Sequence, residues 1–212
     1  ENVKNLKGVD GGKTFKTIIK MLEDLNIYNI YYDVLNTMNY GLPQNRERLY
    51  IVGIKKTVQQ NRVFRFPPKP TKLKKTLKNL ISRSKKHKKT PLKGRYLANK
   101  YGLIAKYKID LEKIRKMDDI RIYNLQPNHE RISFIKKGVS PCLTSNDSRF
   151  FYIMNQERYL LEDEAKKLQG IPTNKYDFSM MSRNKLFYVV GNSMSVNVLV
   201  EIYKQIFKIR SE

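Results

Sequence analysis

A proline-rich segment, Phe64 to Pro70 (FRFPPKP), is the feature that most restricts how this chain can fold. Prolines lack the backbone donor that helices and sheet ladders need, so neither element can run through a cluster of them. The composition also changes here, because residues 71–116 are rich in lysine. We therefore expect two structural units, the first of which ends near residue 60.

Before this boundary, the pattern predicts one helix followed by two strands. Apolar residues recur at helical spacing between Lys13 and Asn26, namely Phe15, Ile18, Ile19, Leu22 and Leu25. Ile27 to Leu35 and Leu49 to Ile54 are short apolar runs typical of strands, and the loop Asn36–Arg48 connects them. The order helix, strand, loop, strand suits the edge of an α/β sheet.

After the boundary, two strands and two helices are predicted. Ile120–Leu125 and Phe150–Met154 are short apolar segments, and Glu162–Gln169 has a helical composition. Ser195–Ile209 is predicted to be an amphipathic helix, with apolar residues on one side: Val196, Leu199, Val200, Tyr203, Ile206 and Phe207.

The positive charge is concentrated in one segment. The chain has a formal net charge of +24, and residues 55–116 contain 22 Lys and Arg but only two acidic residues, Asp110 and Glu112. Such an excess indicates a polyanionic partner, either a nucleic acid or an anionic membrane surface. The alternative is a solvated, lysine-rich face, which can account for about half of the excess.

Several classes of protein do not fit this sequence. We find no run of roughly 20 apolar residues and no leader segment, so we expect a soluble, cytoplasmic protein without a membrane span. A single cysteine, Cys142, excludes an internal disulfide framework, and two histidines, His87 and His129, make a metal site unexpected. Because the chain begins at Glu1 and not at Met, we expect a fragment or a processed product.

Three separated segments carry the chemistry. They are Glu1-Asn2-Val3, the segment 40–48 (YGLPQNRER) and the segment 191–196 (GNSMSV). Between the last two lie the segments 140–144 (SPCLT) and 168–172 (LQGIP). In this order, the segments resemble the later conserved blocks of bacterial DNA (cytosine-5) methyltransferases, whereas residues 55–137 match none of those blocks.

The resemblance implies a fold and a domain organisation. The fold class is α/β: the C-terminal part of a Rossmann-like, S-adenosylmethionine-dependent methyltransferase domain plus a smaller, mixed target-recognition domain. Residues 1–60 and 180–212 would belong to the catalytic domain, and residues 61–179 would form the DNA-binding domain. The implied reaction is methylation of carbon 5 of a flipped cytosine in duplex DNA, in a restriction-modification system.

The resemblance also implies roles for single residues. In this family a cysteine thiolate adds to carbon 6 of cytosine, so that carbon 5 can take the methyl group from the sulfonium cofactor. Glu1 would place a carboxyl group at ring N3 and the exocyclic amine, and Arg48 a guanidinium at O2. Arg46, also assigned to the catalytic set, would contact phosphate or brace the loop. Asn2 and Gln44 would help to hold the DNA substrate.

Each of these roles has a simpler alternative. An N-terminal glutamate is ordinarily a solvated charge. Arg46 and Arg48, which alternate with Gln44 and Glu47, could form a salt-bridge ladder on the surface. Taken singly, the three residues of the first block are therefore weak support for catalysis.

The segment 191–196 implies a cofactor contact, and the segment 140–144 implies a DNA contact. Asn192 and Ser193 would line the S-adenosylmethionine site, with the start of the final helix binding its carboxylate, or would simply cap that helix. Thr144 would contact a DNA phosphate or serve as a turn residue. Cys142 is interpreted as a small packing residue, because the family's nucleophile block lies upstream of Glu-Asn-Val.

The missing nucleophile implies a partner. We expect the catalytic cysteine and the glycine-rich cofactor loop on an upstream segment, which belongs either to the same gene or to a separate subunit. Lys85, Lys86, Lys88 and Lys89 are expected to grip the DNA backbone. Six side chains are of the type that reads guanine or adenine edges, without a choice among them: Arg62, Arg65, Arg83, Arg95, Asn146 and Arg149.

Two other functions stay open at this point. One is a DNA-recognition module that derives from such an enzyme and no longer turns over. The other, less favoured, is RNA methylation by a relative, which suits the long recognition segment poorly. Retention of Glu1, Gln44, Arg46 and Arg48 favours catalysis, because a pure binding module needs no cytosine pocket.

Overall fold

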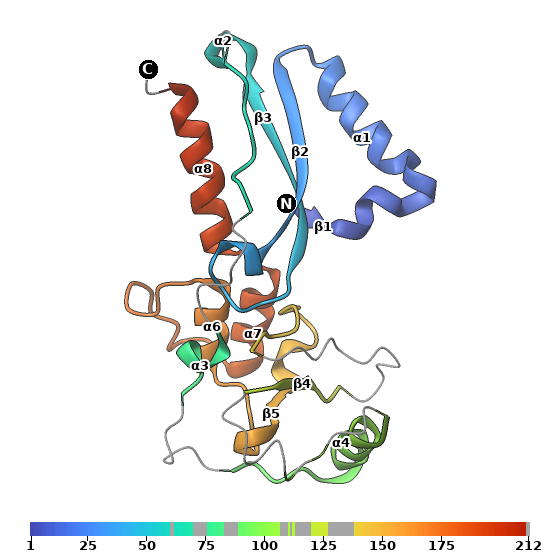
Figure 1. Cartoon of the computed structure of the whole chain (residues 1–212), viewed down its shortest axis with the longest axis vertical. Helices are drawn as coiled ribbons and strands as arrows, with labels where there is room; N and C mark the ends of the chain where they lie inside the picture. Colours follow the sequence, from blue (N-terminus) through green and yellow to red (C-terminus); the bar gives the residue numbers. More distant parts are fainter. Residues whose placement is uncertain are drawn as a thin grey trace.

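The computed structural model of the chain describes residues 1–59, 62–69, 76–82, 89–106, 110, 112, 120–126 and 138–210. Figure 1 shows an upper body, with β1, β2, β3, α1 and α8, above a lower body that contains α3, α4, α6, α7, β4 and β5. Arg83 and the expected DNA-gripping residues Lys85, Lys86 and Lys88 lie outside the described residues.

The upper body is built on an antiparallel sheet of three strands. Its order is β1 (Asn2–Val3), β3 (Glu47–Lys55) and β2 (Tyr28–Asn36). β2 and β3 pair along their whole length, from Tyr28 opposite Lys55 to Asn36 opposite Glu47. Both predicted strands are confirmed, although β3 begins two residues earlier than expected. Arg48 therefore lies within the strand and not in the loop before it.

Alternation along the strands gives the sheet two apolar faces. Leu49 and Ile51 face α1 (Lys13–Asp24), whereas Tyr50 and Val52 face α8 (Val196–Arg210). The result is a helix–sheet–helix sandwich, with α1 and α8 on opposite sides in Figure 1. The buried residues on the α8 side form the larger core: Leu35, Tyr40, Tyr50, Val52, Ile54, Phe64, Val198, Ile202 and Ile209.

The lower body has a second small antiparallel sheet. Its order is β4 (Ile122–Asn124), β5 (Phe151–Ile153) and β6 (Arg158–Tyr159). One face packs on α3 (Leu77–Leu80), α6 (Glu162–Gln169) and α7 (Arg183–Asn192). The aromatic rings of Tyr123 and Tyr152 lie on the other face, in the cluster that includes Tyr96 from α4 (Gly94–Lys106).

Short helical segments link these elements. They are η1 (Lys4–Gly12), η2 (Thr37–Tyr40), α2 (Lys56–Gln59), η3 (Ser148–Phe150) and η4 (Met154–Gln156). α6 has the predicted bounds, because acidic residues fill its first turn and Gly170 ends it in the left-handed conformation (φ 79°). A Cβ atom on Gly170 would also lie 2.6 Å from Asn197 Oδ1 of α8.

A buried ion pair joins β6 to α6. Both guanidinium nitrogens of Arg158 donate to the carboxylate of Glu164, at 2.7 and 2.9 Å, and both side chains are almost fully buried. The backbone N–H of Ser82 and that of Leu161 donate to the same carboxylate. Because the carboxylate has four donors, the desolvation cost of this pair is offset by hydrogen bonds.

The chain crosses between the two bodies later than expected. α7 packs within the lower core through Leu186, Phe187 and Val190, whereas α8 packs in the upper one. Ser193, with an extended backbone (φ −73°, ψ 156°), separates the two helices. The packing therefore changes at residues 193–195, one helix after the expected boundary at residue 180.

α7 and α8 together raise the question of a membrane span. Contrary to the expectation from sequence, the stretch Arg183–Ile209 has the length of a span and contains a window with a mean hydropathy of 1.3. The stretch is not one continuous helix, because Ser193 interrupts it. Phe187 and Val198 are fully buried in the two cores. We therefore interpret α7 and α8 as core helices.

Candidate active site

The sequence blocks that resemble the methyltransferases meet where the upper body contacts the lower body. We call this contact region, which includes residues 43–46, 140–143 and 191–193, the seam. Pro43 O accepts a hydrogen bond from Ser140 N (2.7 Å), and Asn45 N donates to Ser140 O (2.9 Å). Gln44 and Ser140 thus form a parallel bridge that joins the second block to the segment 140–144. These two backbone hydrogen bonds hold the two segments in register.

Gln44 is the fully buried side chain at the centre of this seam. Its amide nitrogen donates to Leu168 O and Gln169 Oε1, both at 2.9 Å. Its amide oxygen accepts from Leu143 N, also at 2.9 Å. We expected Gln44 to contact the substrate, but its amide is engaged within the protein, so it acts as a structural tie in this conformation.

Arg46 crosses the seam and is 2% exposed. Its Nη1 donates to Leu143 O (2.7 Å) and Gly191 O (3.2 Å), and its Nη2 donates to Ser193 O (2.9 Å). Its Nε is buried and has no hydrogen-bond partner within the described part of the chain. Of the two roles expected for Arg46, the geometry fits the brace, because three backbone carbonyls from distant segments converge on one guanidinium.

Glu1 lies between two guanidinium groups. Its Oε1 is 3.5 Å from Arg46 Nη2 and 3.5 Å from Arg48 Nε. The side chains of Glu1 and Arg48 are only 11% and 14% exposed, so their charges are poorly screened by water. Glu47 instead pairs with Lys4 at 2.9 Å, with both side chains well exposed. The interpretation of Arg46 and Arg48 as a surface salt-bridge ladder is therefore wrong.

Cys142 lies against the same two arginines. Its Sγ accepts from Arg48 Nη2 (3.4 Å) and Arg46 Nη1 (3.6 Å), and donates to Leu143 O (3.4 Å). We expected a small packing residue, whereas the thiol has polar neighbours at the edge of the Glu1 carboxylate site. Its position in the sequence did not indicate this environment.

One buried tyrosine near this cluster has a raised pKa. Tyr50 in β3 has a pKa raised well above its ordinary value of 10.0, first by burial and then by the Glu1 carboxylate. Arg46 and Arg48 lower the pKa of Tyr50 in part. The phenol therefore stays protonated at neutral pH and adds no charge beside Glu1.

Asn2 and Thr144 make only local contacts here. Asn2 is exposed, and its Oδ1 accepts from the adjacent Val3 N at 2.8 Å. Thr144 Oγ1 accepts from Asp147 N (3.2 Å), and Thr144 N donates to Ser148 Oγ (2.7 Å). These contacts fit the turn role of Thr144, which was one of its two expected roles.

The third block does not open the last helix, contrary to expectation. Asn192 ends α7, and Ser193 is its C-cap, with a hydroxyl that donates to Val190 O (2.7 Å). α8 begins at Val196, after Ser195, whose Oγ is 2.7 Å from Thr37 Oγ1. The C-terminal end of a helix carries partial negative charge, so the place of Ser193 does not favour a carboxylate.

The close packing at Gly191 was not predicted from the sequence. A Cβ atom there would lie 2.2 Å from Thr144 C and 2.4 Å from Thr144 O, closer than atoms can approach. Only glycine therefore lets α7 pack against the turn that follows Cys142. A glycine inside an otherwise apolar helix segment was the available signal.

Lys89 is the one expected DNA-gripping lysine within the described residues. Its side chain is 77% exposed, and its Nζ lies 2.7 Å from Glu157 Oε2. It is accessible to a polyanion, although part of its charge is compensated by Glu157.

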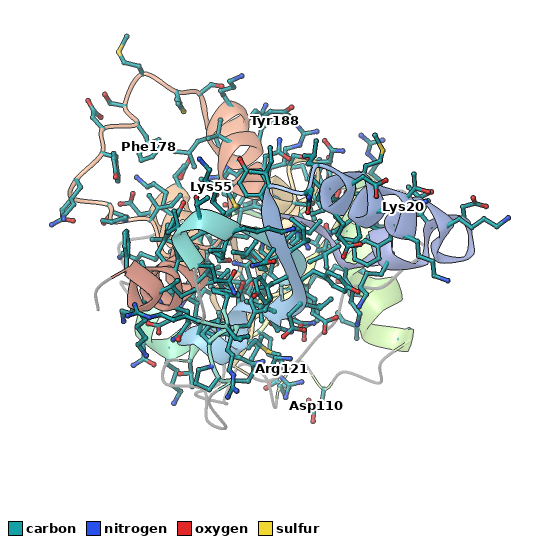
Figure 2. All side chains as sticks on the ribbon, turned by 90° about the horizontal axis from the view of Figure 1, so that it is seen from above. Lys20, Lys55, Asp110, Arg121, Phe178 and Tyr188 are labelled. Carbon is teal, nitrogen blue, oxygen red and sulfur yellow. The ribbon has the colours of Figure 1, made fainter. Side chains whose placement is uncertain are left out.

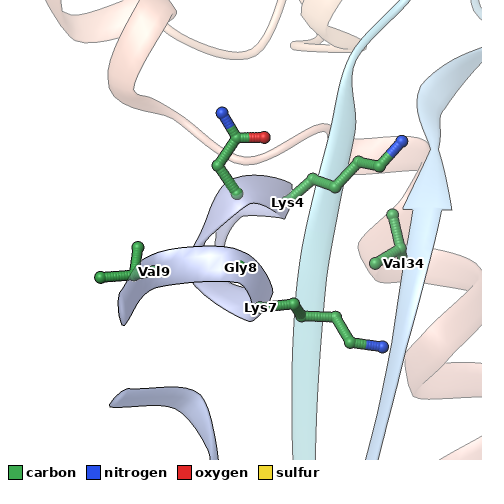
Figure 3. A pocket seen from close by; sticks show the side chains of 6 residues that line it. Lys4, Lys7, Gly8, Val9 and Val34 are labelled. Carbon is green, nitrogen blue, oxygen red and sulfur yellow. The ribbon is translucent and has the colours of Figure 1, made fainter. Parts of the chain in front are cut away.

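A separate hollow lies beside η1. It has a volume of about 710 Å³ and is lined by Lys4, Asn5, Lys7, Gly8, Val9 and Val34. Figure 3 shows Lys4 and Lys7 extending toward the strands, with Val34 opposite them. The Lys7 ammonium also lies over the rings of Phe15 and Tyr32, at 5.8 and 5.5 Å. Neither Glu1 nor either arginine of the cluster lines this hollow.

The fold is that of the methyltransferases. The crystal structure of the S. pombe Dnmt2 methyltransferase aligns with 98% of this chain and 64% of its own, with a TM-score of 0.59 at 14% identity. The Entamoeba histolytica methyltransferase EhMeth aligns with 100% of this chain and 62% of its own, with a TM-score of 0.57 at 17% identity. The expected Rossmann-like methyltransferase fold is confirmed.

The chain belongs to the C-5 cytosine-specific DNA methylase family, whose profile matches residues 1–208. It is 34% identical to the type II methyltransferase M.Bsp6I of Bacillus sp. (strain RFL6) over 218 aligned positions, which cover 98% of this chain and 64% of that protein. It is 32% identical to M.SsoII of Shigella sonnei, with 97% and 51% covered. The chain thus spans about half to two thirds of the length of these curated relatives.

Proposed function

We propose that this chain supplies the DNA-reading part and one side of the cytosine pocket of a DNA (cytosine-5) methyltransferase. The enzyme would transfer a methyl group from S-adenosylmethionine to carbon 5 of a flipped cytosine in duplex DNA. The observation that carries the proposal is the Glu1 carboxylate, which lies 3.5 Å from both Arg46 and Arg48, with all three side chains less than 15% exposed. Membership of the cytosine-specific family supports the choice of base.

The cluster of Glu1, Arg46 and Arg48 can stabilise the electron density that the reaction places on the cytosine ring. When a thiolate adds to carbon 6 of cytosine, the electron pair of the 5,6 double bond becomes available at carbon 5 and spreads toward N3 and O2. A carboxyl group at N3 and a guanidinium at O2 stabilise that density in the transition state. Glu1 and Arg48 are the groups for these positions, whereas Arg46 holds Glu1 and the seam in place. Loss of the proton from carbon 5 then restores the double bond and releases the thiolate.

The cofactor site is only partly built from this chain. Bound S-adenosylmethionine would supply an electrophilic methyl group, and its sulfur would leave as a neutral thioether. Asn192 fits a polar contact to it, because its side chain is exposed and has no hydrogen-bond partner in the described part of the chain. The hydroxyl of Ser193 is donated to Val190 O, which leaves its lone pairs as the available group.

The remaining parts of the pocket would come from another segment. The curated relatives are longer, and this chain covers 64% and 51% of the first two. Two helices of the upper body have exposed apolar side chains: Met21 on α1, with Leu25 at its C-cap, and Tyr203 and Phe207 on α8. In the view from above, α1 with Lys20 lies at one edge of the molecule (Figure 2). Exposed apolar patches of this kind mark interaction surfaces, and we assign them to the segment that carries the catalytic cysteine.

Duplex DNA is the proposed partner of the lower body. Residues 55–116 contain most of the excess positive charge, including Lys85, Lys86, Lys88 and Lys89. In the proposed arrangement, the lower body, which includes α7, forms the recognition domain, and the upper body, which includes α8, belongs to the catalytic domain. The type II relatives support a restriction-modification setting, and the enzyme would act on DNA in the bacterial cytoplasm.

A transfer assay tests this proposal. The chain is expressed together with the reading frame immediately upstream of the codon for Glu1, and labelled S-adenosylmethionine is supplied with cytosine-containing duplex DNA. We expect the label in 5-methylcytosine. Label in RNA alone would favour the RNA methyltransferase alternative, and DNA binding without any transfer would favour the non-catalytic module.

A further inference from the structure

Six side chains have the chemistry to read base edges, and the structure separates them. Arg62 Nη1 donates to Ile209 O at 2.8 Å, so its guanidinium is committed to the end of α8. Arg83 lies outside the described residues. Asn146 and Arg149 are exposed, and both belong to one short turn. This turn directly follows Cys142, which contacts the arginines of the proposed cytosine pocket.

Thr144 and Ser148 close this turn from inside. Ser148 Oγ accepts from Thr144 N (2.7 Å) and donates to Thr144 O (2.5 Å), and Ser148 is 1% exposed. Asp147 N donates to Thr144 Oγ1 (3.2 Å). Asn146 stands at the exposed tip, and its side chain has no hydrogen-bond partner in the part of the chain that the structure describes. Its amide is therefore free to bind a ligand.

The base of the turn is locked to the proposed pocket. Leu143 N donates to Gln44 Oε1, and Leu143 O accepts from Arg46 Nη1. On its other side, the backbone at Thr144 packs directly on Gly191 of α7. A ligand that contacts the tip of the turn is thus placed at a defined position relative to Glu1.

A stack of four side chains extends from the turn to α4. Arg149 lies over the ring of Phe150 (4.9 Å), Phe150 stacks on Tyr96 (5.9 Å between centroids, 26° between planes), and Arg95 lies over Tyr96 (5.6 Å). Both arginines are exposed at the outside of the stack. Stacking on a ring fixes the orientation of the guanidinium plane. The N–H donors at the edge of that plane stay available for two parallel hydrogen bonds to a base.

We propose that the turn 144–149 is the surface that reads base pairs flanking the target cytosine, with Asn146 and Arg149 as its specificity-determining residues. This inference rests on the proposed function. Asn146 is four positions after Cys142, so it lies at most about 14 Å from it along the chain. At about 3.4 Å for each base pair, Asn146 reaches at most roughly four pairs from the flipped base, and Arg149, seven positions after Cys142, at most roughly seven. Asparagine pairs with adenine N6 and N7, and arginine with guanine O6 and N7.

The experiment is selection of bound sequences from a pool of random duplexes by the full chain. We expect enrichment of a short motif around a cytosine. Each bidentate contact should discriminate about 5- to 150-fold against the wrong base. Arg149→Lys keeps the charge but loses the two parallel N–H donors of the guanidinium. It should therefore relax the preference at one guanine, while the total affinity changes less than about threefold. Asn146→Ala should relax the preference at one adenine.

The control is Lys20→Ala, which removes an exposed positive charge from α1 in the upper body. It should leave the enriched motif unchanged. A motif that survives both Arg149→Lys and Asn146→Ala, or a wild-type chain that enriches no motif, would overturn the inference. A motif that responds to these variants in a protein that never supports methyl transfer would keep the inference and overturn the proposed function.

Discussion

Arg46 Nη2 lies 3.5 Å from Glu1 Oε1, across 45 positions of sequence, and the same nitrogen donates to Ser193 O at 2.9 Å. One buried guanidinium thus joins the first, second and third of the blocks that suggest a methyltransferase. The proposed cytosine pocket and the seam between the two bodies are therefore one structure, and a change at Arg46 should affect both.

The first prediction concerns stability at Arg46. Arg46→Ala removes one donor each from Leu143 O, Gly191 O and Ser193 O, of which the first keeps Cys142 Sγ and the last keeps Gln169 Nε2 as a donor. We expect the free energy of unfolding to fall by about 3–5 kcal/mol. Urea denaturation followed by circular dichroism measures this loss. Arg65→Ala, at an exposed position, should cost less than about 0.5 kcal/mol, and equal losses for the two variants would show that Arg46 is not the brace.

The second prediction compares two glycines in helices. Gly191→Ala places a Cβ atom 2.2 Å from the backbone of Thr144, so α7 or the turn must move. We expect a loss of about 1–3 kcal/mol in unfolding free energy, as in other overpacked cores. Gly102→Ala in α4 has open space around its Cβ and should stabilise the helix by about 0.5–1 kcal/mol. If the melting temperature falls for Gly191→Ala and rises for Gly102→Ala, the close approach is confirmed. If both melting temperatures change in the same direction, it is contradicted.

The third prediction concerns salt. Binding to duplex DNA should weaken with a slope of about −0.9 in log affinity against log salt for each phosphate contact, with roughly five to ten contacts. Charge-neutralising substitutions at Lys85, Lys86, Lys88 and Lys89 should flatten the slope and weaken all sequences alike. Fluorescence anisotropy between low and moderate salt measures both effects. An unchanged slope would mean that these lysines form only a solvated face.

The fourth prediction concerns alkaline pH. Burial, with a further contribution from the Glu157 carboxylate, raises the pKa of Tyr152 from 10.0 to about 12. Between these values the unfolded chain loses a proton that the folded chain keeps, so stability should fall as the pH rises through this window. Below about pH 10 the contribution is fully present. Tyr152→Phe should reduce this alkaline loss, whereas Tyr203→Phe, at an exposed position, should not. Urea midpoints across pH 8 to about 12 test this.

The elements with a clear period could be predicted from the sequence. The sequence predicts α1 and α8 because their apolar residues recur at helical spacing, β2 and β3 because they are short apolar runs, and α6 because of its composition. α7 was not predicted, because its core sequence, Leu186 to Val190 (LFYVV), is continuously apolar and has no helical period. The four-residue helices α2 and α3 are too short to show any period.

The site could be predicted only in part. The residue types of the second block indicated Arg46 and Arg48, but the partners of Arg46 are backbone carbonyls at positions 143, 191 and 193. Backbone carbonyls have no signature in a sequence, so the brace became visible only in three dimensions. The sequence places Ser193 at the start of the last helix because it gives no sign of α7, of which Ser193 is the C-cap.

The central claim is that Glu1 and Arg48 act on the cytosine ring, and turnover measures it directly. In the assembled enzyme, Glu1→Gln and Arg48→Ala should each lower kcat by on the order of a hundredfold or more. DNA affinity should stay within about threefold of the wild type, because these groups act mainly on the transition state. Cys142→Ser should keep nearly full turnover. If Cys142→Ser abolished methyl transfer while Glu1→Gln left it intact, the assignment of the pocket would be wrong.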